Sequence, residues 1–453
     1  MKRPDKGPAD GPWSDQWRRE TSAEFAYRSF DWDPGQGRLD LNYSLDGIPL
    51  TETFGFPVSG RPDPSLEPAL DAAFRFLHWV AGISYWKAGC PQRVLFEGKQ
   101  PDRWQADWLN RLFQEGLAEF AFRQKLSVAR FAVFEGQGER PQSASSLDLD
   151  ERLLVPMGGG KDSLVAWDRL NRRGMVAGTV QVGQSALIAE VARQAGSPHW
   201  RIRRQVAPQL AVLNTQGAFN GHVPITAINA AALVVLALLL GHGGIAFANE
   251  RSADEPTLTG DDGLPVNHQF SKSFRFERML DAWVRHYIAA NLNVFSILRR
   301  DRELGVCQAF AELDHFHDVF SSCNRNFHLD GPRTRRWCGQ CPKCQFVFLG
   351  LAPFLPPERL EAIFGQDLLD DPAQLDGFAK LLALDGEKPF ECVGEANEAR
   401  AAIKALSASK RWRGHAIVEA LGPRLRSLTV PSLDDLCRPG GPHLIPEVLL
   451  DEA

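Results

Sequence analysis

The sequence predicts an α/β protein: a doubly wound parallel sheet, preceded by an α+β domain and followed by a helical tail. In the middle of the chain, short apolar runs alternate with helical patterns, as the strands and crossover helices of a parallel sheet do. Nearer the N-terminus, two alternating runs flank a turn, and from about residue 356 prolines separate short helical patterns. With 453 residues, the chain is long enough for two or three domains.

The composition is that of an ordinary globular protein, with 44% hydrophobic and 24% charged residues. A formal net charge of -5 gives no electrostatic reason to expect a nucleic-acid surface. Residues 1–20 are charged, rich in Pro and Gly, and lack the apolar segment of a secretory signal, so we expect a mobile leader. These features predict a cytoplasmic protein with a small-molecule substrate, no nucleic-acid partner and no membrane segment.

The α+β domain, expected over residues 21–140, begins with a predicted β-hairpin. Arg38–Leu45 alternates polar and apolar residues, Asp46-Gly47 supplies a turn, and a second extended run reaches from Ile48 to Phe54. Two helical patterns follow, around residues 66–77 and 104–112. A stretch rich in Gly, Gln, Ser and Pro between residues 136 and 148 predicts a linker to the next domain, which we place at residues 148–352.

The strongest motif lies where the first strand of the parallel sheet, around residues 153–156, meets a helix. It reads, in order, Gly158, Gly159, Gly160, Lys161, Asp162 and Ser163. Glycines let backbone N–H groups close around an anion, and the following helix adds its positive dipole end. We therefore interpret the motif as a loop for a nucleotide phosphate, with an unliganded glycine-rich turn as the alternative. It is not a Walker A loop, because Asp162 stands where that loop needs Ser or Thr.

Later elements are expected to bring more polar residues to the same edge of the sheet. Strands are predicted at residues 175–182, 200–206 and 245–249, and helices at 162–173, 186–194 and 225–240. The last helix is uncharged but too short for a bilayer, so we expect it in the core. Ligands bind at the carboxyl ends of parallel strands, where the glycine motif and Glu250 would both lie. The candidates for proton transfer are Glu250, Asp254, Glu255, His268 and Lys272, with His222 as a weaker one.

Four of the eight cysteines form a candidate metal site. They are Cys323, Cys338, Cys341 and Cys344, the last three in C-x2-C steps. Four thiolates at such spacing predict a tetrahedral Zn²⁺ site, and an iron–sulfur cluster, which uses the same ligands, stays the alternative. Four protein ligands leave no position for water, so the metal would be structural. The adjoining loop carries Arg333, Arg335, Arg336 and Lys343, which either contact phosphates or form a solvated basic turn.

The glycine motif resembles the PP-loop of ATP pyrophosphatases, Ser-Gly-Gly-x-Asp-Ser, with Gly158 in place of the first serine. Members of that superfamily split ATP between its α and β phosphates and transfer AMP to a substrate oxygen. The resemblance implies an adenine nucleotide alpha hydrolase-like sheet. It also implies roles in binding ATP and Mg²⁺: the glycines with Lys161 and Ser163 at the β and γ phosphates, Asp162 at Mg²⁺, and Val180 and Val182 near the adenine.

Ser322-Cys323 and the Cys338–Cys344 run are similar to 7-cyano-7-deazaguanine synthase, which activates a carboxylate with ATP and carries a structural zinc. Its spacer is shorter, and it lacks the N-terminal domain. With the motifs at residues 158–163, 267–273 and 337–344, nearly the whole chain is more similar to the UDP-N-acetylmuramoyl-L-alanyl-L-glutamate epimerases.

That resemblance implies an ATP-dependent isomerase of peptidoglycan precursor biosynthesis. It would invert the terminal L-Glu of UDP-MurNAc-L-Ala-L-Glu to D-Glu through an acyl-adenylate and release AMP and pyrophosphate. Two alternatives stay open: another PP-loop enzyme that activates a carboxylate for ligation or amidation, and a non-catalytic, zinc-stabilised module that binds ATP.

Overall fold

The computed structural model describes residues 17–260, 263, 265–327, 335–384, 389, 391 and 393–450. Most of the expected leader, residues 1–16, and Arg333 of the basic loop lie outside the described residues. At the described end of the leader, Trp17 is buried and donates a hydrogen bond to Asp46 (2.8 Å), and Arg19–Thr21 form one 3-10 turn, η1.

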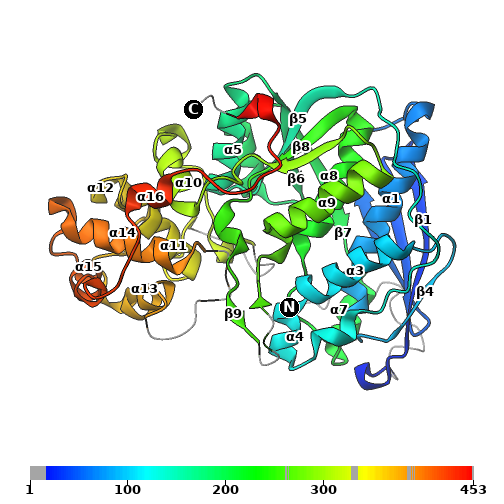
Figure 1. Ribbon diagram of the computed structural model, residues 1–453, viewed down its shortest axis with the longest axis horizontal. Coiled ribbons are helices and arrows are strands. Elements are labelled where there is room, and N and C mark those ends of the chain that lie inside the picture. The colour runs from blue at the N-terminus through cyan, green and yellow to red at the C-terminus, as the bar shows by residue number, and fades with distance from the viewer. Residues whose placement is uncertain are drawn as a thin grey trace, which may run out of the picture.

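One sheet of nine strands runs through the molecule in the order β11-β8-β5-β6-β7-β3-β2-β1-β4 (Figure 1). Its strands are β1 (Glu24–Asp33), β2 (Arg38–Leu45), β3 (Ile48–Gly55), β4 (Arg93–Phe96), β5 (Asp150–Pro156), β6 (Val176–Val182), β7 (His199–Gln205), β8 (His242–Phe247) and β11 (Asn293–Ser296). From β11 to β7 neighbouring strands are parallel, which confirms the α/β expectation. The expected hairpin of β2 and β3 is confirmed, with both turn residues, Asp46 and Gly47, at positive φ.

The N-terminal region continues the parallel sheet, because β3 pairs antiparallel with β7 from Thr53–Gln205 to Gly55–Arg203. Helix α1 (Glu67–Ala81) also packs on α8 (Ile225–Leu240), and one hydrophobic core takes residues from both regions. The boundary that we expected near residue 140 therefore falls inside a single sheet and a single core.

Helices cover both faces of the sheet. Leu154 of β5 contributes to one core, while its neighbours Leu153 and Val155 contribute to a second core, as the alternation of a strand requires. The helices of the first core include α1, α3 (Arg103–Gly116), α8 and α9 (Phe274–Tyr287), and those of the second include α5 (Lys161–Asn171), α6 (Ala186–Ala195), α10 (Glu303–Ala311) and α11 (Pro342–Leu351). Helix α8 has the bounds predicted for it and is almost wholly buried. Among the described helices, none combines the length and apolar character that a membrane span needs.

The C-terminal region after residue 352 is helical, as expected, and packs onto the second core. It comprises α12 (Pro357–Phe364), α13 (Leu375–Leu381), α14 (Ala396–Ala408), α15 (Ala416–Leu421) and α16 (Leu433–Cys437). Helices α13 and α14 contact α11, α16 contacts α10, and the chain then returns toward α5 (Figure 1). The described residues also form the short helices α2 (Ile83–Trp86), α4 (Ala118–Gln124) and α7 (Gln209–Thr215), and a two-stranded sheet of β9 (Leu258–Thr259) with β10 (Pro265–Val266).

Candidate functional site

The glycine motif lies at the carboxyl end of β5 and leads directly into α5, whose N-cap is Gly160. The buried hydroxyl of Ser163 closes this loop, because it accepts a hydrogen bond from the Gly158 amide (3.3 Å) and donates one to the Gly160 carbonyl (3.0 Å). A second segment supports the loop, since the Ser321 amide donates to the Gly159 carbonyl (3.0 Å). The backbone is therefore held in a fixed turn at a helix start, the geometry that anion-binding loops use.

The backbone conformation favours glycine at Gly159, and the neighbouring side chains approach both Gly159 and Gly160 closely. Gly159 has a φ of +80°, and a Cβ there would lie 2.8 Å from the Leu187 side chain. A Cβ on Gly160 would lie 2.5 Å from Ser322 Oγ. A Cβ on Gly158 would meet nothing within 4 Å, so the position where the PP-loop motif has its serine retains the space for that side chain.

Lys161 is buried and forms ion pairs with Asp162 and with Glu303, the first residue of α10. Burial lowers the pKa of Lys161, but the two carboxylates outweigh it and hold this pKa well above its usual value. Burial raises the pKa of Glu303, and Lys161 opposes that rise. Asp162 lies in the first turn of α5 and does not cap the helix.

A cavity of about 50 Å³ joins these residues to the segment that follows β8. Its lining includes Lys161, Asp162, Asn249, Glu250, Gln269, Lys272, Glu303, Ser322 and Lys343. The structure thus brings together the glycine motif, two of the proton-transfer candidates and one cation of the basic loop. Strand β8 ends at Phe247, before the predicted strand end at residue 249, so Asn249 and Glu250 are already part of the loop.

More carboxyl groups lie at or near this cavity than the sequence analysis predicted. Glu250 is buried, and burial together with the neighbouring Glu303 and Glu398 raises its pKa well above the usual value. Glu398 comes from α14 and is fully buried, and burial raises its pKa to about 7. The carboxyl groups of Glu250 and Glu303 therefore line the cavity, and that of Glu398 lies near them without lining it, an arrangement that favours a bound cation or a retained proton.

The buried side chain of Arg299 fixes the two loops that carry the proton-transfer candidates. Its guanidinium donates to the Glu277 carboxylate (2.9 Å), to the Glu250 carbonyl (2.9 Å) and to the Lys272 carbonyl (2.7 Å). Arg299 is 1% exposed and Glu277 is 4% exposed. Sequence reasoning missed this pair, because a charge inside a helical or loop pattern gives no sign of its burial.

His268 is not among the residues that line this cavity. Its ring forms a hydrogen bond with Glu119 of α4, and His222 lies 3.4 Å from the same carboxylate. Burial, followed by the nearby His268, lowers the pKa of His222 to about 4. A carboxylate oxygen of Glu119 and ring nitrogens of His222 and His268 lie within 4.8 Å of one another, so the weaker candidate His222 joins His268 in one polar cluster.

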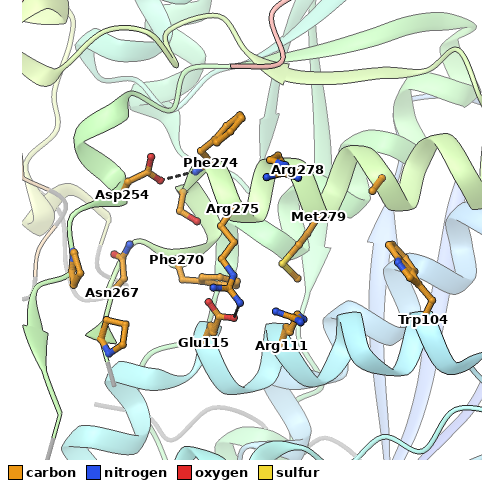
Figure 2. Close-up of a pocket in the computed structure, with 14 residues that line it drawn as sticks. Trp104, Arg111, Glu115, Asp254, Asn267, Phe270, Phe274, Arg275, Arg278 and Met279 are labelled. Atoms are coloured by element: carbon orange, nitrogen blue, oxygen red, sulfur yellow. Dashed lines mark hydrogen bonds and ion pairs between the residues drawn. The ribbon is translucent and has the colours of Figure 1, made fainter. Parts of the chain in front are cut away.

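The remaining candidates are placed as follows. Asp254 is exposed, and its carboxylate accepts a hydrogen bond from the Phe274 amide (2.7 Å) at the start of α9, which gives it a structural contact (Figure 2). Glu255 directly follows η4 (Arg251–Asp254) and is half-buried. Val180 of β6 is buried, and its carbonyl accepts a hydrogen bond from the Met157 amide (2.7 Å); Val182 ends the same strand.

The four cysteines converge, with all four sulfurs within 4.8 Å of one another. The amides of Gln340 (3.5 Å) and Cys341 (3.3 Å) point at Cys338 Sγ, and Gly339 has a φ of +72° in the same turn. None of Cys323, Cys338, Cys341 and Cys344 forms a disulfide. Four free thiols in this arrangement match the donor set of a tetrahedral thiolate site.

The basic loop is divided between two roles. Arg336 forms an ion pair with Glu190 of α6 (2.8 Å) and donates to the Val319 carbonyl (2.7 Å), so it stabilises the loop. Lys343 lines the small cavity with Lys161. The exposed Arg335 lies at the edge of the described residues.

Comparison with known proteins identifies the family. The model described as MurL N-terminal domain matches residues 16–297, and the model described as MurL C-terminal domain matches residues 319–435. A relative from Xanthomonas oryzae pv. oryzae, named UDP-N-acetyl-alpha-D-muramoyl-L-alanyl-L-glutamate epimerase, is 40% identical over 92% of this chain and 94% of its own length. Relatives of the same name from Micromonospora sp. and Salinispora tropica are each 37% identical, over 93% and 96% of this chain and 96% and 95% of their own lengths. The chain belongs to the UDP-N-acetyl-alpha-D-muramoyl-L-alanyl-L-glutamate epimerase family.

Proposed function

We propose that this protein is an ATP-dependent epimerase that inverts the terminal L-Glu of UDP-MurNAc-L-Ala-L-Glu in peptidoglycan precursor synthesis. The observation that carries the proposal is the cavity at the carboxyl end of β5, where the glycine motif meets Glu250 and Lys272. The relatives supply the reaction, because each bears the name of this epimerase over nearly its full length.

A nucleotide makes chemical sense in such an epimerase. The α-carboxylate of a terminal glutamate is ionised, so removing the α-proton would place a second negative charge on the same few atoms. An acyl-adenylate removes that obstacle, because the mixed anhydride is uncharged at the acyl carbon and its carbonyl accepts the carbanion charge. Activation therefore replaces the electron sink that a cofactor would otherwise supply.

The proposed steps balance without another reactant. A carboxylate oxygen attacks the α-phosphorus of ATP, and pyrophosphate leaves with the electron pair of the broken bond. A base takes the α-proton, and an acid returns a proton to the opposite face. Water then attacks the acyl carbon, and AMP leaves with the original carboxylate oxygen.

The glycine motif would hold ATP. The backbone of Gly158–Gly160, with Ser163, fits the β and γ phosphates because the turn is fixed and lies at a helix start. The ammonium of Lys161 adds positive charge, and Asp162 would hold Mg²⁺, which neutralises phosphate charge when bound. Val180 and Val182, at the end of β6, are assigned to the adenine side.

Glu250 and Lys272 are the proposed pair for proton transfer. Both line the cavity, and they lie on the two loops that Arg299 connects. The raised pKa of Glu250 favours its protonated form, so we assign it the acid role in the L-to-D direction, with Lys272 as the base. The Glu119–His268 pair is the reserve assignment, since a carboxylate can orient a histidine for the same task.

The Cys323, Cys338, Cys341 and Cys344 cluster is proposed to hold a structural Zn²⁺. With four thiolates, the site has no position for substrate. It would instead fix the segment that supplies Ser322 and Lys343 to the cavity.

The decisive test of this mechanism is an oxygen-18 transfer experiment. UDP-MurNAc-L-Ala-L-Glu labelled with oxygen-18 in the α-carboxylate is incubated with the protein, ATP and Mg²⁺. We expect one labelled oxygen in the AMP, together with D-Glu after hydrolysis of the product. D-Glu that forms with its label retained and without any AMP would refute the adenylate, and an amidated product would indicate the ligase alternative.

A further inference from the structure

A second, larger cavity of about 630 Å³ lies between α3 and α9 (Figure 2). Its volume is that of a typical small-molecule site. The residues that matter here are Trp104, Arg111 and Glu115 of α3, and Arg275, Arg278 and Met279 of α9. Neither the family models nor the names of the relatives assign it a ligand.

Three arginines, Arg111, Arg275 and Arg278, and two carboxylates, Glu115 and Asp254, line this cavity, so its charged side chains carry a net positive charge that favours an anion. Arg275 forms an ion pair with Glu115 (2.7 Å). Arg111 and Arg278 come from the two facing helices, and neither forms an ion pair with a described residue. Arg111 also interacts electrostatically with Glu115, and its planar N–H donors, like those of Arg278, are suited to phosphate oxygens.

The other walls are apolar. Trp104, Met279 and Phe270 line the cavity between the arginines, and Figure 2 shows Trp104 at the end remote from Asn267. Guanidinium groups beside aromatic and aliphatic side chains fit a ligand that carries phosphates at one end and a flat, weakly polar ring at the other. A nucleoside diphosphate has both parts.

Only one turn of chain separates this cavity from the small one. Asn267, Phe270 and Ser273 line the large cavity, whereas Gln269 and Lys272 line the small cavity. The 3-10 helix η5 (Phe270–Lys272) thus presents opposite faces to the two spaces. A long ligand could hold its phosphates in the large cavity and extend its other end past η5 to Lys272.

We infer that the large cavity binds the nucleoside diphosphate end of the substrate, with Arg111 and Arg278 on the diphosphate. This inference rests on the proposed function for its substrate. It assigns a specificity site to the N-terminal region, because α3 supplies one wall, and it separates recognition of the UDP end from activation of the carboxylate at the glycine motif.

The test measures both binding and turnover in the full-length protein. UDP alone is titrated by calorimetry into the wild type and into the variants Arg111→Ala, Arg278→Ala and Arg103→Ala. Arg103 is the matched control, because it is exposed on the same helix α3 but does not line the cavity. We expect each cavity variant to weaken UDP binding by about tenfold or more, and the control to bind as the wild type does.

Enzyme kinetics then distinguish the loss of a UDP contact from a general disturbance of the fold. The KM for UDP-MurNAc-L-Ala-L-Glu should rise by a similar factor with little change in kcat, while MurNAc-L-Ala-L-Glu, which lacks UDP, should react equally with wild type and variants. Arg278→Lys should lose less UDP affinity than Arg278→Ala, because lysine keeps the positive charge but lacks the planar pair of N–H donors of the guanidinium group. Arg111 and Arg278 are exposed, so these variants are expected to fold.

The outcomes distinguish this inference from the proposed function. Epimerisation with an unchanged KM in both alanine variants would overturn the inference and leave the epimerase intact. If the wild type binds UDP but does not epimerise the substrate, and the variants lose UDP binding, the nucleoside diphosphate site is supported and the proposed function is refuted. UDP that does not bind, or that binds equally to all variants, would also overturn the inference.

Discussion

Arg299→Ala tests the buried connection beneath the candidate site. The guanidinium of Arg299 forms an ion pair with Glu277 and donates hydrogen bonds to the Glu277 carboxylate and to the carbonyls of Glu250 and Lys272. The substitution would leave Glu277, only 4% exposed, without its cation, and would leave the carbonyls of Glu250 and Lys272 without this donor. Removing one partner of a buried ion pair costs about 3–5 kcal/mol of unfolding free energy, because the remaining charge is desolvated and unpaired.

The pH dependence of that loss follows from Glu277. Burial already raises the pKa of Glu277, and Arg299 opposes the rise, so the variant should have a still higher pKa at this residue. A carboxyl group whose pKa is higher in the folded than in the unfolded state favours folding at low pH, and this contribution is lost as pH rises through the folded pKa. The stability deficit of Arg299→Ala should therefore be larger at pH 8 than at pH 5.

Urea unfolding at both pH values measures the effect, with kcat measured in parallel. Arg172→Ala is the control, because Arg172 pairs with Asp168 on the exposed surface of α5 and its loss should cost about 1 kcal/mol or less. The double variant Arg299→Ala/Glu277→Gln should recover part of the stability, since no unpaired charge is left. A deficit below about 1 kcal/mol, or one that is the same at both pH values, would refute this reasoning.

Three further predictions concern the loop, the metal and the cavity. Gly160→Ala should reduce ATP binding about tenfold or more, because the new Cβ would meet Ser322. Gly158→Ala should change ATP binding little, because a Cβ there meets nothing within 4 Å. Nucleotide titration measures both affinities, and equal losses in the two variants would contradict this prediction. Cys341→Ser should lower the bound zinc, measured by elemental analysis, from one equivalent per chain toward none, and it should reduce the melting temperature. Wild-type protein that contains neither zinc nor iron would contradict the metal assignment. Burial raises the pKa of Glu398 to about 7, so its contribution favours folding at low pH and is lost as pH rises through 7. In Glu398→Gln, the unfolding free energy measured in urea should therefore fall less between pH 5 and pH 8 than in the wild type. An equal fall in both proteins would disprove that role.

Local patterns predicted the elements around the site well. The bounds of α8 and the β2–β3 hairpin follow from unbroken apolar composition and from strict alternation around Asp46-Gly47, signals that need no knowledge of distant contacts. The glycine motif was placed correctly between a strand and a helix for the same reason. The convergence of the four cysteines followed from their spacing.

Long-range partners could not be predicted in this way. Nothing in the sequence links β3 to β7, so the N-terminal region was expected as a separate domain. Glu303 of α10 lines the cavity beside Lys161, and Glu398 of α14 lies close enough to raise the pKa of Glu250; only the tertiary fold brings these residues together. The short strand β11 was also missed, although its carboxyl end leads to Arg299 and Glu303 at the edge where such sheets bind ligands.

The central claim is that ATP activates the glutamate so that its α-proton can exchange. The most direct measurement incubates the protein with UDP-MurNAc-L-Ala-L-Glu, Mg²⁺ and ATP in deuterium oxide and follows the glutamate α-carbon by mass spectrometry and chiral analysis. The account predicts D-Glu carrying one deuterium, formed with AMP and only when ATP is present. Deuterium incorporation without ATP, or ATP that stays intact while D-Glu forms, would contradict it.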